Sequence, residues 1–201
     1  MSGPEPGGSP TPEAPQPSAW QAPPPGPAKA AGPAPGVAYA DLGIRIGAYI
    51  IDVIVQVILF AIIGGIIIGI VASISGAVGA ILSVIFIIAF EAAFSAIYFI
   101  YSWTSLRASP GQKALGLETV NAADGRTVTQ PQAIRRWLFL FGPFILLSAL
   151  QLVVGSTLGG LFGLISFGYF VYLLYTTYQD PKRQGYHDHQ ANTVVVKRTA
   201  A

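Results

Sequence analysis

Two long stretches without a charged side chain constrain this sequence more than any other feature. The first covers residues 53–90 and resumes after the single acid Glu91 over residues 92–106, and the second covers residues 137–179. About 20 apolar residues cross a bilayer as one helix, so each stretch is long enough for two crossings. Only 10% of the residues are charged, against about 25% in soluble domains. The sequence therefore predicts an all-α membrane protein with four transmembrane helices.

The polar residues between these stretches place the ends of the predicted helices. We expect helices over about residues 42–71, 79–103, 134–154 and 161–178, within a membrane domain of residues 37–198. Thr129 and Gln132 form a capping-box pattern before the third helix. Pro143, which follows a glycine, predicts a kink within that helix.

The polar segment between the second and third helices carries signals for a small β structure. Residues 115–120 and 127–129 flank Asp124-Gly125, a dipeptide that is typical of a hairpin turn. A β-branched run over residues 193–196 follows the last helix. We expect these runs to form a small cytoplasmic β flap under the helices.

The N-terminal segment differs in composition from the rest of the chain. Residues 1–36 hold 12 of the 16 prolines and almost no large apolar side chains, which predicts a disordered Pro-rich tail. The segment lacks the basic start and apolar core of a signal peptide. A solvated spacer is the favoured interpretation, and a binding segment for a protein partner, centred on Pro23-Pro24-Pro25, is the alternative.

Nine of the 11 lysines and arginines fall in two segments of the chain. The loop after the second helix and the C-terminal segment contain Arg107, Lys113, Arg126, Arg135, Arg136, Lys182, Arg183, Lys197 and Arg198. The two short loops on the opposite side carry no charge. Because cytoplasmic loops carry an excess of lysine and arginine, we expect a multi-pass protein with both termini in the cytoplasm.

Three ionisable residues fall in or beside the predicted helices: Arg45, Asp52 and Glu91. A carboxylate at bilayer depth costs about 2.5–3.5 kcal/mol, so it needs a partner, a proton or a wet cavity. Asp52 and Glu91 differ in depth by about 6 Å at 1.5 Å per residue. They could face one polar pocket that carries a proton or a cation, or join a polar network that fixes helix packing. The second interpretation is slightly favoured.

Other chemistry has little support in the sequence. The chain has no cysteine, which excludes a disulfide framework and a cysteine-based metal site. His187 and His189 flank Asp188, and in an extended segment they would point to opposite faces. We therefore assign no metal ligand, no cofactor and no catalytic residue, and expect a protein that is not an enzyme. The net charge of +2 is too small to suggest a nucleic-acid partner.

Three short segments resemble signatures of a known membrane-protein family. Residues 45–52 (RIGAYIID), 109–117 (SPGQKALGL) and 180–188 (DPKRQGYHD) are similar, in that order, to segments of the RDD family, named for one arginine and two aspartates. The resemblance spans about residues 37–198. It departs from the family at Glu118, where a basic residue is common.

The resemblance implies a bacterial plasma-membrane protein and assigns the name-giving residues to Arg45, Asp52 and Asp188. Asp180 competes with Asp188 for the last position. It also suggests transport of an undefined ligand, and sodium/proton exchange is linked to a few family members. We expect Arg45 to pair with one of the two tail aspartates and to pin the C-terminal segment against the helices. Asp52 would then lie deeper, free to be protonated or to bind a cation.

Two functions follow from these expectations. The first is a small transporter or a cation/proton-coupled exchanger that uses Asp52 and Glu91. The second is a non-catalytic accessory or scaffold protein that recruits partners through its cytoplasmic loop and Pro-rich tail. Four helices leave little room for a transport pathway, so transport would call for a homo-oligomer. The expected partners are thus the lipid bilayer, further copies of the chain and a protein that binds the tail.

Overall fold

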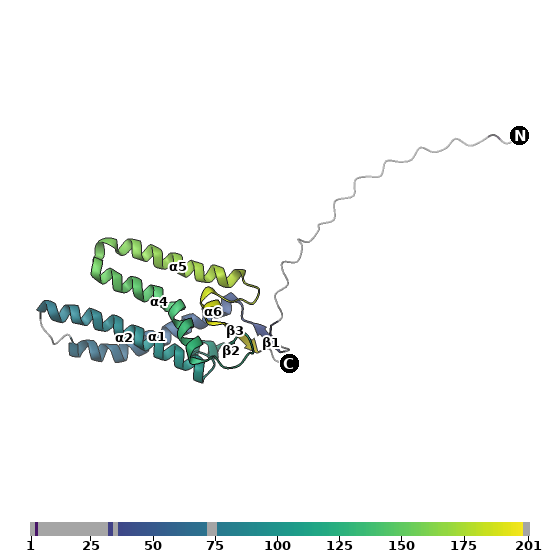
Figure 1. The fold of residues 1–201 in the computed structure, drawn as a ribbon, viewed down its shortest axis with the longest axis horizontal. Helices are drawn as coiled ribbons and strands as arrows, with labels where there is room; N and C mark the ends of the chain where they lie inside the picture. The colour runs from purple at the N-terminus through teal and green to yellow at the C-terminus, as the bar shows by residue number, and fades with distance from the viewer. Residues whose placement is uncertain (1–2, 4–31, 34–35, 72–75, 199–201) are drawn as a thin grey trace.

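The computed structural model describes Gly3 and residues 32–33, 36–71 and 76–198. The predicted disordered tail lies almost wholly outside the described residues, as does most of the turn expected between the first two helices. The described chain forms four long helices with a small sheet at one end of them (Figure 1).

The four long helices confirm the predicted membrane architecture. They are α1 (Leu42–Val71), α2 (Gly76–Ser105), α4 (Gln130–Val154) and α5 (Gly159–Gln179). Each contains a segment long and apolar enough to cross a bilayer. The helix α4 begins about four residues before its predicted start because its capping box forms. In it, the backbone N–H of Thr129 donates to Oε1 of Gln132 at 3.0 Å.

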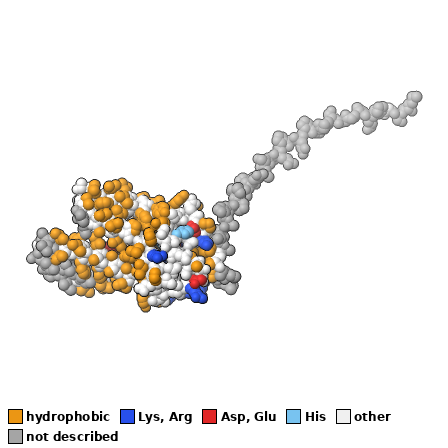
Figure 2. Space-filling model, in the orientation of Figure 1, with side chains coloured by type: hydrophobic (Ala, Val, Ile, Leu, Met, Phe, Trp, Pro, Cys, Tyr) orange, Lys and Arg blue, Asp and Glu red, His pale blue; other side chains and the backbone are white. Residues whose placement is uncertain are grey.

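The long helices make a closed ring. The helix α1 contacts α2 and α5, and α4 also contacts α2 and α5. On the face drawn in Figure 2, hydrophobic side chains cover the helices, and charged side chains gather at the end that carries the sheet. A surface divided in this way suits a bundle in hydrocarbon with one polar end in water.

The helix α4 contains a proline, and a side chain of the neighbouring helix α5 replaces the backbone hydrogen bond that this proline cannot make. Pro143 lies inside α4 and has no N–H to donate to the carbonyl of Phe139, four residues earlier. The hydroxyl of Tyr169, on α5, donates to that carbonyl instead. This hydrogen bond supplies a donor inside a membrane span, where no bulk water can do so, and it ties α5 to α4.

A polar layer, which we define as residues 37–41, 106–129 and 180–198, covers one end of the bundle. It contains the strands β1 (Val37–Tyr39), β2 (Leu117–Asn121) and β3 (Thr193–Arg198), with β3 in the middle of an antiparallel sheet. It also contains two short helices that were not predicted, α3 (Pro110–Ala114) and α6 (Tyr186–Ala191).

The predicted β flap is confirmed, but its predicted pairing is wrong. The main partner of β2 is β3, along its whole length, and residues 127–129 contribute only an isolated bridge between Thr127 and Val120. The strand β2 pairs with β3 rather than with residues 127–129 because β3 is a buried run of β-branched residues. Val195 of that run is fully buried in a cluster with Leu117 of β2 and Ala48 of α1.

The acid that departs from the family pattern has basic partners in the polar layer. Glu118 lies 3.0 Å from Nε of Arg107 through one carboxylate oxygen and 2.8 Å from Nε of Arg198 through the other. Arg198 belongs to the neighbouring strand β3. The reversed charge at this position therefore links β2 to β3 and to the loop that precedes α3.

Candidate functional site

The centre of the polar layer is a fully buried carboxylate, that of Asp188. Asp188 lies in the first turn of α6, and its Oδ2 accepts a hydrogen bond from the backbone N–H of Gly185 at 3.1 Å. The segment around it is helical, so the expectation of an extended His187-Asp188-His189 run is wrong. The helix forms because Asp188 caps its own first turn.

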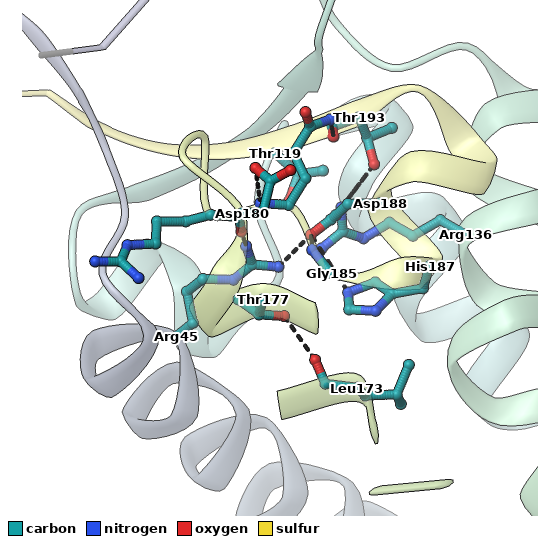
Figure 3. A network of polar contacts seen from close by, with 12 residues as sticks. Arg45, Thr119, Arg136, Leu173, Thr177, Asp180, Gly185, His187, Asp188 and Thr193 are labelled. Atoms are coloured by element: carbon teal, nitrogen blue, oxygen red, sulfur yellow. Dashed lines mark hydrogen bonds and ion pairs between the residues drawn. The ribbon is translucent and has the colours of Figure 1, made fainter. Parts of the chain in front are cut away.

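Two arginines from different membrane helices converge on Asp188 (Figure 3). Arg45 of α1 pairs with one carboxylate oxygen, and Arg136 of α4 pairs with the other. Arg136 also donates to Oγ1 of Thr193, in β3, at 2.8 Å. We call Arg45, Arg136 and Asp188 the Asp188 clasp. It joins α1, α4, α6 and β3 at a single point.

The clasp confirms the predicted pairing of Arg45 with a tail aspartate and settles the choice between the two candidates. Asp180, the competing residue, instead lies 2.8 Å from Nε2 of His189. Its other carboxylate oxygen accepts the backbone N–H of Lys182 at 2.7 Å. Asp180 thus shapes the turn between α5 and α6 and takes no part in the clasp.

Electrostatic interactions fix the charges of two residues outside the membrane spans, Asp188 of the clasp and its neighbour His187. Burial alone would raise the pKa of Asp188, but Arg136 and Arg45 outweigh it and hold that pKa well below its usual range. Burial lowers the pKa of His187 to about 3, even though Asp188 opposes the shift. Asp188 is therefore an anion and His187 is neutral at physiological pH.

Arg136 is the functional-site residue that sequence reasoning missed. It was counted only among the basic residues that set the membrane orientation. Its guanidinium lies 4.8 Å from the ring centre of Trp103, and the whole side chain is buried. Its position at the edge of an uncharged stretch was the available signal, because an arginine there must face either the headgroups or a buried anion.

Asp52 holds the loop helix α3 against α1. Its carboxylate accepts hydrogen bonds from the hydroxyl of Tyr98 at 2.9 Å, from the hydroxyl of Ser109, and from the backbone N–H of Gly111 at 2.7 Å. The expectation that Asp52 is left without a partner is therefore wrong, because three donors satisfy a carboxylate that is 2% exposed.

Glycine is required where α3 meets α1. A Cβ atom at Gly111 would lie 2.1 Å from the carbonyl oxygen of Ala48 and 2.9 Å from Cγ of Asp52. The backbone of α3 thus approaches the backbone of α1 more closely than any side chain allows. The serine, glycine and glutamine of the SPGQ segment each have a role here, since Gln112 also completes a capping box with Ser109.

Glu91 lines a large cavity, which we call the inner cavity. This inner cavity, of about 730 Å³, lies among the four long helices. Its polar lining residues are Gln56, Glu91, Ser95, Ser148 and Ser166. Within the described residues, the Glu91 side chain makes no hydrogen bond or ion pair. The carboxylate that lacks a partner is thus Glu91, in contrast to Asp52.

Asp52 and Glu91 do not share a pocket. Asp52 lines a separate clasp cavity of about 150 Å³, together with Arg45, Arg136 and His187, and Glu91 lines the inner cavity. The two cavities have a common wall of aromatic side chains, which are Tyr49, Phe141, Phe144 and Phe170. The hypothesis of one pocket with two carboxylates is therefore wrong.

The described part of the chain offers no evident metal centre. Over residues 36–71 and 76–198, no three His, Cys, Asp or Glu side chains gather in a way that could hold a metal ion.

Comparisons with known proteins give one match. The family model described as the RDD family matches residues 39–192, which includes all three members of the Asp188 clasp, Asp52 and both cavities. Neither the curated proteins nor the solved structures contain a match.

Proposed function

The chain belongs to the RDD family of integral membrane proteins, and from this premise we propose that it carries cations or protons across the bilayer through Glu91. One observation carries the proposal. It is the carboxylate of Glu91, which has no hydrogen-bond or ion-pair partner among the described residues and lines a cavity among the four membrane helices. An ionisable group inside a membrane span is costly to keep, and such groups mark ion and substrate pathways.

The position of Glu91 along α2 supports this role. The candidate span in α2 covers Ile81–Ser105, so Glu91 is its eleventh residue of 25 and lies near the middle of the bilayer. A site at that depth is equally distant from both membrane surfaces. Transporters commonly place their substrate and ion sites near the midplane for this reason.

The chemistry of a single carboxylate provides the coupling. One carboxylate can hold a proton or a cation, but not both, so binding of one species releases the other. Gln56 and Ser148, from α1 and α4, offer oxygen atoms along the same cavity. Exchange of a proton for a cation at Glu91 would therefore be obligatory at this site.

Asp52 has a different role in this proposal from the one that the sequence suggested. Because two of its three donors, Ser109 and Gly111, hold α3 against α1, Asp52 and the Asp188 clasp together fix the polar layer to the helices. The proposed carrier is separate from these groups, and their variants should differ in phenotype. Variants of Glu91 should lose transport and keep the fold, whereas variants of Asp52 should lose stability first.

We also infer the orientation from the polar layer. It carries seven of the 11 lysines and arginines of the chain, and β1 and β3 bring both ends of the membrane domain to that layer. The positive-inside rule then favours a cytoplasmic polar layer and cytoplasmic termini in a bacterial plasma membrane. Protease digestion of sealed vesicles of known orientation tests this placement.

Flux measurements in proteoliposomes test the proposed transport. The purified full chain is reconstituted, a sodium or potassium gradient is imposed, and internal pH is followed with a trapped dye. We expect cation-driven proton movement in the wild type and in the control Asp124→Asn, whose carboxylate lies in an exposed turn. We expect no movement above empty liposomes in Glu91→Gln. Equal movement with Glu91→Gln and the wild type would overturn the proposal.

A scaffold function is the second candidate. It is supported by the ordered polar layer, which builds a three-stranded sheet and two short helices on one side of the bundle. If wild-type proteoliposomes show no cation or proton flux under any imposed gradient, the scaffold function is favoured over transport.

A further inference from the structure

We propose that the inner cavity binds an organic monocation with an apolar body, such as a substituted ammonium or phosphonium ion. The inference rests on the proposed function in so far as this cation is the cargo that Glu91 exchanges for protons. Binding itself, however, is a separate property of the cavity and can be measured without transport.

The volume of the cavity is the first argument. A water molecule occupies about 30 Å³ of liquid, whereas pockets for small organic ligands measure about 300–1,000 Å³. The inner cavity, of about 730 Å³, falls in the second range. A proton or a bare sodium ion would leave most of this space unused, so the size favours an organic ligand.

The walls of the cavity are the second argument. Most of its lining is apolar, and seven of the lining side chains are aromatic, namely Tyr49, Phe60, Phe94, Phe141, Phe144, Phe167 and Phe170. Aromatic faces attract cations through the negative potential of the ring, and they also pack against apolar substituents. A hydrated metal ion would meet few oxygen atoms here, whereas an organic cation would meet aromatic and aliphatic side chains from all four long helices.

The charge of the cavity is the third argument. Among the described residues that line it, Glu91 is the only one with a charged side chain. Phe94 follows Glu91 by three positions on α2 and thus lies on the same face of the helix. One carboxylate beside an aromatic ring is the arrangement that recognises a single positive charge on an apolar body. An anion of the same shape would be repelled.

Equilibrium binding of tetraphenylphosphonium tests the proposal. The full-length protein is placed in lipid nanodiscs, and the bound cation is measured by dialysis against empty nanodiscs. We expect saturable binding by the wild type, at least tenfold weaker binding by Glu91→Gln, and unchanged binding by Asp124→Asn. Phe94→Leu keeps the apolar bulk and removes the ring, so it should weaken binding about 3- to 10-fold.

Tetraphenylborate serves as the anion of matched shape. Saturable binding of the cation but not of the anion, with loss in Glu91→Gln, supports the proposal. Equal binding of the cation by Glu91→Gln and the wild type would overturn it, as would equal binding of the anion. The latter results would mean that the cavity is a lipophilic space filled by acyl chains.

Failure of this inference differs from failure of the proposed function. Glu91-dependent proton flux without tetraphenylphosphonium binding would reject the organic cation and leave transport standing. Glu91-dependent binding without any flux would support the site and reject transport.

Discussion

Replacement of Asp188 by asparagine should release β3 from the membrane bundle. Asparagine has nearly the same shape, and its side-chain oxygen can still accept the backbone N–H of Gly185. The substitution removes the charge and replaces one carboxylate oxygen with an NH2 group, which cannot accept a hydrogen bond from an arginine. Arg136, with 3% of its side chain exposed, and Arg45, with 11%, then lose the anion that balances them.

The expected magnitude follows from the burial of all three groups. Removal of one partner from a buried ion pair costs about 3–5 kcal/mol, since it leaves an uncompensated charge out of water. Every 1.4 kcal/mol is a tenfold change in an equilibrium constant, so local opening should become about 100- to 3,000-fold more frequent. An exposed ion pair is worth at most about 1 kcal/mol, which sets the scale for a control.

Hydrogen exchange followed by mass spectrometry measures this opening in the β3 peptide. The amides of β3 are bonded to both β1 and β2, so they exchange only when the sheet opens. We expect exchange in Asp188→Asn to accelerate by the factor above. The control Asp124→Asn removes the same charge from a pair whose partner, Arg126, is 86% exposed, and it should match the wild type. Wild-type protection of β3 in Asp188→Asn would refute the clasp.

Three further predictions concern the fold and its pH dependence. Gly111→Ala forces a Cβ to within 2.1 Å of the carbonyl of Ala48, so it should cost about 3 kcal/mol in detergent unfolding and expose α3 to hydrogen exchange. Tyr169→Phe leaves the carbonyl of Phe139 unpaired and should lower the free energy of unfolding by about 1–3 kcal/mol. The loss should be much smaller in a background that carries Pro143→Ala, because the backbone N–H of the alanine can then pair with that carbonyl. The pKa of His187 is lowered to about 3 in the folded protein. Between about pH 6.5 and pH 3, His187 therefore binds a proton only when its segment opens. The free energy of opening should thus fall by about 1.4 kcal/mol for each unit by which the pH is lowered. Exchange of β3, corrected for the intrinsic rate at each pH, measures this slope, and His187→Gln should flatten it.

The membrane helices could be predicted because their signal is local. Uninterrupted apolar residues determine a transmembrane helix wherever the rest of the chain lies. The two short helices α3 and α6 had local signals as well, since Ser109 precedes Gln112 by three positions and Gly185 precedes Asp188 likewise. The first of these spacings is a capping-box pattern that the sequence reading passed over.

The partners in the sheet and at the carboxylates could not be predicted from spacing. The strand β1 pairs with β3 across almost the whole chain, because Val37 lies opposite Arg198. Asp52 meets Ser109 and Gly111 only after a complete helical hairpin has folded back. Hydropathy placed each residue at the correct end of the bundle, but packing decided which donors reached it.

Side-chain packing also explains why one contact of the clasp could be predicted and the surroundings of Glu91 could not. The pairing of Arg45 with a tail aspartate was predictable, because these residues lie at the polar end of the bundle, but the choice of Asp188 over Asp180 was left to the structure. The separation of Glu91 from Asp52 could not be predicted, since two acids at similar depth on neighbouring helices can equally well share a pocket. The side chains of Tyr49 and Phe141, which line both cavities, form part of the wall between them.

Labelling with a hydrophobic carbodiimide tests most directly whether Glu91, rather than Asp52, is the available carboxylate of the membrane domain. The reagent enters the bilayer and adds to protonated carboxyl groups, and the modified residue is located by mass spectrometry of the wild type in lipid. We predict modification of Glu91, slowed by tetraphenylphosphonium, and none of Asp52, one oxygen of which accepts from Tyr98 and Gly111 and the other from Ser109. Modification of Asp52 with Glu91 left intact would contradict the account.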